Sequence, residues 1–116
     1  MQAEAYVQVH QMAPGFTRDQ ERQAFDHALD LLENAQSLPS TSNDAMEALR
    51  FCQKLWGFLI KDLSDPANDL PEDLRGNLIS IGLWVLRETD AILAGKSQNW
   101  KGVIDINRTV REGLAQ

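Results

Sequence analysis

Residues 78–86 read Leu78-Ile79-Ser80-Ile81-Gly82-Leu83-Trp84-Val85-Leu86, a run of nine residues without a charge. In a run this short, periodicity alone does not separate a buried strand from the middle of a buried helix. The flanking residues favour a helix. Pro71 followed by two acids is typical of a helix start, and Gly95 is typical of the residue just past a helix end. The sequence therefore predicts one helix over 71–94, and its uncharged centre predicts that this helix is the most buried.

Two residues inside this helix are unusual for their position. Gly82 lies in mid-helix, where glycine costs about 1 kcal/mol relative to alanine, so we expect a neighbouring helix to approach closely there. Trp84 projects roughly 130° from the centre of the apolar stripe at 100° per residue. Its position leaves open whether it makes a second packing contact or an exposed recognition patch. The stripe itself is predicted to contain Leu74, Leu78, Ile81, Val85 and Ile92.

Three further helices are predicted by periodicity and by their end signals. Thr17 and Gln20 have the spacing of a capping box, ahead of a helix over 18–37. Thr41 or Ser42 is expected to cap a helix over 43–63, and the last helix covers 100–114. Residues 1–12 fit a short helix or a loose arm, which Pro14 and Gly15 end. The chain is thus predicted to be one all-α domain over 1–116, a bundle of four main helices with residues 1–15 as a short N-terminal helix or mobile arm.

The helices over 43–63 and 100–114 carry features that bear on packing. The first has one apolar seam through Leu49, Cys52 and Trp56, and a second seam through Phe51, Leu55 and Phe58. A helix with two seams is able to contact two neighbours at once. In the last helix Asn107 falls in the middle of the inner stripe, so a buried amide there needs hydrogen-bond partners.

The length, net charge and cysteine count of the chain narrow the class of protein. The chain has 116 residues, a net charge of -6 and one cysteine. A length of this order is usual for one domain, and the acidic balance argues against general nucleic-acid binding. A single cysteine fits a reducing compartment. No signal-peptide pattern and no uncharged apolar run of ~20 residues is present, so we expect a soluble, cytoplasmic protein without membrane contact.

No residue pattern points to catalysis, a metal or a cofactor. Cys52 lies on an apolar seam without a nearby histidine, so core packing is the better interpretation. His27 lies off the buried stripe and is expected to be solvated. The acidic stretch over 62–73 lacks the spacing and glycine of a calcium loop. The cations near the C-terminus alternate with acids and favour a salt-bridged surface over RNA contact. We therefore expect no enzyme activity and no cofactor.

Several segments resemble the FlaF family of flagellar biosynthesis regulators from flagellated alphaproteobacteria. The segments are Glu21-Arg-Gln-Ala-Phe-Asp-His-Ala28, Leu55-Trp56, Leu70-Pro-Glu-Asp-Leu-Arg75, Leu78-Ile-Ser-Ile-Gly-Leu-Trp-Val-Leu-Arg-Glu88 and Val103-Ile-Asp-Ile-Asn-Arg-Thr-Val-Arg-Glu-Gly-Leu114. They cover nearly the whole chain in the family's order and spacing. The segment from Leu78 to Glu88 is the most specific of them.

The resemblance implies a cytoplasmic, non-enzymatic chaperone that holds flagellin before secretion and helps to control flagellin production. Alternatives are a post-transcriptional regulator of flagellin mRNA acting with the flagellin regulator FlbT, and a structural helical subunit of a larger complex. The oligomeric state stays open. An amphipathic flagellin segment would fit a groove between helices. From the helix faces we infer the partner-binding residues ourselves, and they are Phe51, Leu55, Phe58, Leu83, Trp84, Tyr6 and Val7. Of these, Tyr6 and Val7 are expected to cover the groove in the free protein.

Overall fold

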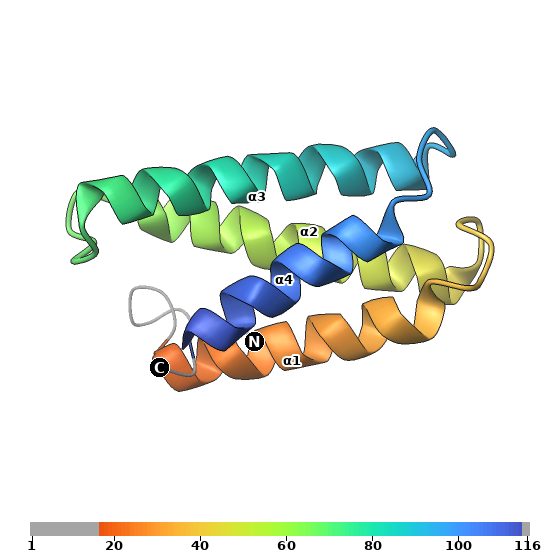
Figure 1. Ribbon diagram of the computed structural model, residues 1–116, viewed down its shortest axis with the longest axis horizontal. Coiled ribbons are helices and arrows are strands. Elements are labelled where there is room, and N and C mark those ends of the chain that lie inside the picture. Colours follow the sequence, from red (N-terminus) through yellow and green to blue (C-terminus); the bar gives the residue numbers. More distant parts are fainter. Residues whose placement is uncertain (1–16, 115–116) are drawn as a thin grey trace.

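The computed structural model describes residues 17–114, which form four α-helices and no strand (Figure 1). The helices are α1 (Arg18–Ala35), α2 (Asn43–Leu63), α3 (Glu72–Leu93) and α4 (Trp100–Leu114). The predicted all-α fold is therefore confirmed. The bounds of the second and fourth helices agree with the sequence prediction. The first helix ends two residues earlier than predicted, and the third is one residue shorter at each end. The short helix or arm predicted for residues 1–12 lies outside the described residues.

Successive helices run in opposite directions, so the bundle has an up-down-up-down topology (Figure 1). The start of α1, the end of α2, the start of α3 and the end of α4 all lie at one end of the bundle. α2 packs against both α1 and α3, α1 also packs against α4, and α3 makes only a small contact with α4. The prediction that the helix over 43–63 contacts two neighbours is confirmed. The α3–α4 edge is the loosest of the four helix pairs in contact.

Local hydrogen bonds explain where the helices begin and end. The Thr17 hydroxyl accepts from the Gln20 backbone N–H, and the Gln20 side chain accepts from the Thr17 N–H, which is the predicted capping box. Ser42, rather than Thr41, caps α2 by accepting from the Ala45 N–H. α3 ends at Leu93, and Gly95 two residues later has a φ of 74°, in the left-handed region that glycine adopts without strain. These three boundaries are thus set by residues within a few positions of the helix end.

The prediction that the 71–94 helix is the most buried is wrong. α3 buries only Gly82, Val85, Thr89 and Ile92, whereas α2 buries eight residues along its whole length. Leu74, placed in the buried stripe by its spacing, is 43 % exposed. The reason is position in the bundle. α2 has a neighbour on each side, but α3 has one close neighbour and one distant neighbour, so part of its apolar circumference has no cover.

Gly82 allows α3 to approach α2. A Cβ at this position would lie 2.7 Å from Trp56 Cε3 and 2.9 Å from Ile60 Cδ1. These distances are shorter than van der Waals contact, so only glycine fits without a shift of the neighbouring side chains. The close approach expected from the sequence is confirmed. On the same interface, Gln53 of α2 donates hydrogen bonds to Thr89 Oγ1 (3.0 Å) and Asp90 Oδ1 (2.7 Å).

A buried polar contact joins α4 to α2. Trp56 Nε1 donates to Asn107 Oδ1 over 2.8 Å, and Asn107 Nδ2 donates to the Val103 carbonyl over 2.7 Å. The same amide nitrogen lies 3.6 Å from Cys52 Sγ. Asn107 and Trp56 are both buried, and Phe25 packs edge-on against the indole with ring centroids 5.7 Å apart. The asparagine in the inner stripe therefore finds the partners that its burial requires.

Candidate partner-binding surface

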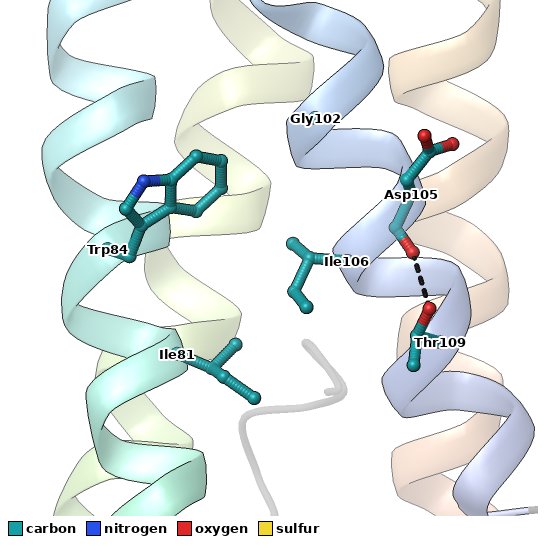
Figure 2. Close-up of a pocket in the computed structure, with 6 residues that line it drawn as sticks. All are labelled: Ile81, Trp84, Gly102, Asp105, Ile106 and Thr109. Carbon is teal, nitrogen blue, oxygen red and sulfur yellow. Dashed lines mark hydrogen bonds between the residues drawn. The ribbon is translucent and has the colours of Figure 1, made fainter.

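A hollow opens along the loose edge of the bundle, between α3 and α4 (Figure 2). Ile81 and Trp84 extend toward it from α3, and Ile106 extends toward it from α4. Its volume is about 370 Å³, and Gly102, Asp105 and Thr109 complete its lining. The carboxylate of Asp105 is paired with Lys101 over 2.6 Å. The rest of the lining, which is not engaged in a salt bridge, is mainly apolar. We call this surface the α3–α4 hollow.

A larger cavity lies at the end of the bundle where α1 begins. Its volume is about 610 Å³, and all four helices and the α2–α3 loop contribute to its lining. The apolar lining residues are Phe25, Trp56, Leu59, Leu63, Leu70, Leu74, Leu78, Ile81 and Val110. We call this the end cavity. Ile81 and Thr109 line both the end cavity and the α3–α4 hollow, so the two are neighbouring parts of one apolar surface.

Carboxylates dominate the polar part of the end cavity. Glu21, Asp62 and Asp69 line it together with one cation, Arg18. Burial, and then the negative charge of Asp62, raise the pKa of Glu21 to about 7. Burial also raises the pKa of Asp62, with a smaller contribution from Asp65. Glu21 therefore exchanges a proton near neutral pH, and the cavity presents carboxyl groups that can accept or donate hydrogen bonds.

The structure separates Phe51, Phe58 and Trp84, the three rings predicted from helix faces to bind a partner. Phe51 packs edge-on against His27 of α1, with ring centroids 4.8 Å apart, whereas Trp84 faces α4. Phe58 is half-buried and packs against the core. One groove does not contain all three rings. Trp84 is the member that lines a hollow.

The other predicted partner-binding residues have different environments. Leu55 is 3 % exposed and belongs to the core, so its side chain offers little surface to a partner. Leu83 is 44 % exposed on α3 but lines neither cavity. Tyr6 and Val7 lie outside the described residues. Sequence reasoning missed Ile106 as a lining residue, and it missed Glu21 with Asp62. Nothing in their spacing signals that these two acids share a cavity.

Two residues weighed for chemistry have the environments that the sequence predicted. Cys52 is 0 % exposed, and burial raises the pKa of its thiol to about 12, so the residue is a core side chain rather than an activated thiolate. His27 is exposed. Among residues 17–114, no group of three His, Cys, Asp or Glu side chains is arranged to hold a metal ion.

The cations of α4 are paired, as the alternating charges predicted. Arg111 Nε donates to Asp26 Oδ1 over 2.7 Å, and Arg108 pairs with Glu33. Both pairs join α4 to α1, and Lys101 is paired within α4. The hydrogen bond to Asp26 raises the pKa of Arg111 above its ordinary value. This surface is therefore already neutralised and holds α4 against α1.

Fold and surface together define a small helical-bundle protein whose distinctive features are apolar hollows beside a loosely packed helix. The model of the family described as "Flagellar protein FlaF" matches residues 2–114, and the chain belongs to this family. It is accordingly a flagellar protein. Comparisons with curated proteins and with solved structures give no significant match. None of the helices in residues 17–114 has the length and apolar character needed to cross a membrane.

Proposed function

We propose that this protein is a cytoplasmic, non-enzymatic chaperone that binds unassembled flagellin before export and thereby helps to control flagellin production. Membership of the FlaF family supports a flagellar role. The partner follows from what the family resemblance implies, and the apolar surface along α3 supports the mode of binding.

The observation that carries the proposal is the incomplete cover of α3. This helix holds the uncharged run over 78–86, yet it buries four residues and leaves Leu74 and Leu83 more than two-fifths exposed. Trp84 and Ile81 line a hollow beside α4 instead of being enclosed. Apolar surface of this kind on a small protein marks a site of interaction.

An amphipathic helix is the partner element that fits the α3–α4 hollow. Flagellin has amphipathic terminal segments, and such a segment can place apolar side chains at i, i+3 and i+4 against Ile81, Trp84 and Ile106. Cover of that segment would prevent premature assembly. Trp84 is the expected anchor, because a half-buried tryptophan at the centre of an interface contributes strongly to affinity.

The test measures binding of purified flagellin monomer by calorimetry and size exclusion. Trp84→Ala is expected to weaken binding at least about tenfold, which is about 1.4 kcal/mol. Phe51→Ala is the matched control, because its ring is also half-buried but packs on His27 at the α1–α2 pair. Raising the salt concentration should change the affinity little, since the contact is apolar.

Two outcomes would overturn the proposal. The first is the absence of any complex with flagellin, and a complex with FlbT in its place would then favour the regulator. The second is an equal loss of affinity for Trp84→Ala and Phe51→Ala, with helical content unchanged by circular dichroism. Equal losses would show that the α3–α4 hollow is not the binding surface.

A further inference from the structure

We infer that residues 1–16 of this chain pack into its own end cavity and cover the apolar lining there. The inference does not depend on the proposed flagellin binding. It rests on the cavity's size and lining, on where α1 begins, and on the composition of the sixteen residues before Thr17.

The end cavity is too large and too apolar to be an ordinary interior void. Its volume of about 610 Å³ exceeds by far the water-sized gaps that close-packed cores contain. Trp56 and Phe25, otherwise the centre of the core, reach its wall, and Leu74 at its edge is 43 % exposed. Such a surface requires cover by another apolar segment.

Chain connectivity puts this cavity within reach of the segment that precedes Thr17. Arg18, the first residue of α1, is itself a lining residue, so the preceding segment leaves the helix at the cavity's edge. Sixteen residues reach up to ~50 Å when extended, which is longer than the ~33 Å of α3. Because the segment is joined to α1 at the edge of the cavity, its effective concentration there is of order millimolar. Binding of this segment is therefore favoured over binding of a free partner at lower concentration.

The composition of the segment fits the lining. Residues 1–16 contain no lysine or arginine and one acid, Glu4. Their larger apolar side chains include Tyr6, Val7, Val9, Met12 and Phe16. They also carry hydrogen-bond donors in the Tyr6 hydroxyl and in three glutamine amides.

Those donors suit the carboxyl groups of the cavity. Among residues 17–114, the side chains of Glu21 and Asp62 form no hydrogen bond or salt bridge, although both line the cavity and the charge of Arg18 acts on Glu21. A second copy of this chain is a poorer occupant. With a net charge of -6, it would bring further acids to a surface already rich in carboxylates.

Thiol reactivity in the full-length protein tests the inference without flagellin. Leu74→Cys places a thiol at the end cavity, and Leu83→Cys is the matched control. The two leucines have equal exposure, 43 % and 44 %, but are nine residues apart and therefore on opposite sides of α3. The native Cys52 does not interfere, because it is 0 % exposed and its thiol pKa is about 12.

The expected result is that a water-soluble maleimide labels the thiol of Leu74→Cys at least about tenfold more slowly than that of Leu83→Cys. Adding Tyr6→Asp, Val7→Asp and Val9→Asp should remove this difference by accelerating only the first thiol. Circular dichroism of each variant confirms that the helices remain. Equal labelling rates without the three aspartates, or no effect of the aspartates, would overturn the inference.

The other occupants have their own signatures in the same assay. Protection of the Leu74→Cys thiol that grows with protein concentration would assign the cavity to a second copy. Protection that arises only after flagellin is added would assign it to that partner. Either result contradicts intramolecular cover, whereas failure of flagellin to bind leaves the labelling result unchanged.

Discussion

α2 and α3 are neighbouring helices of similar length, but they differ in how much of their surface is buried. α2 carries two apolar seams separated by charges and buries eight residues. α3 has the uncharged centre over 78–86, yet it buries four residues and leaves Leu74 and Leu83 exposed. Burial therefore follows the number of neighbours that a helix has rather than its hydrophobicity. The excess apolar surface of α3 marks it as the helix available to other segments.

The strongest test of this difference places an aspartate once on the buried side of α3 and once on its exposed side. Val85 is fully buried against the core and Leu83, two residues earlier, is 44 % exposed. Val85→Asp is expected to cost at least about 4 kcal/mol, because it buries an unpaired carboxylate, and to unfold the protein. Leu83→Asp should change the free energy of unfolding by less than about 1 kcal/mol. Urea denaturation measures both, and similar losses would mean that α3 has no exposed side.

The second prediction concerns the contact that makes α2 the centre of the bundle. Asn107→Leu keeps the volume of the side chain but removes the acceptor of the Trp56 indole N–H. We expect a loss of about 2–3 kcal/mol, since the buried donor stays unpaired. Combining Asn107→Leu with Trp56→Phe in a double-mutant cycle should give a coupling of about 1–2 kcal/mol. Additive losses would contradict a direct energetic link between α2 and α4.

The smallest expected changes in stability come from alanine substitutions of two glycines in α3, one at the α2–α3 interface and one away from it. A Cβ at Gly82 would clash with Trp56 and Ile60, whereas one at Gly76, earlier in α3, meets nothing within 4 Å. Gly82→Ala should therefore destabilise the protein by about 1–2 kcal/mol despite its better helix propensity. Gly76→Ala should stabilise it by about 0.5–1 kcal/mol. Thermal melts of the two variants that shift in the same direction would show that α3 does not approach α2 this closely.

Much of the fold could be derived from local signals. The capping box at Thr17 and the glycine after α3 were identified from residue types and spacing, and the cap of α2 was narrowed to Thr41 or Ser42. Gly82 and Asn107 were likewise identified, the first as a close approach and the second as a buried amide. These features were accessible because helix ends and helix faces depend on residues within a few positions of one another.

The candidate site was harder to predict from the sequence. Phe51 and Trp84 both leave the main seam of their helices, but a helical wheel does not tell which neighbour lies on that side. One ring meets His27 of α1, and the other lines a hollow with α4. The sharing of one cavity by Glu21 and Asp62 is equally invisible in the chain. All of these relations join residues from different helices.

The amino-acid order alone settled the helical class, the helix ends and the face that each helix could bury, because hydrogen bonding and side-chain periodicity act over one or two turns. The packing of the helices decided which faces were buried in fact. α4 lies close to α1, held there by the Arg111–Asp26 and Arg108–Glu33 pairs, and makes only a small contact with α3. That placement leaves part of the apolar side of α3 uncovered, because α4 packs along α1 and touches α3 only over a small area.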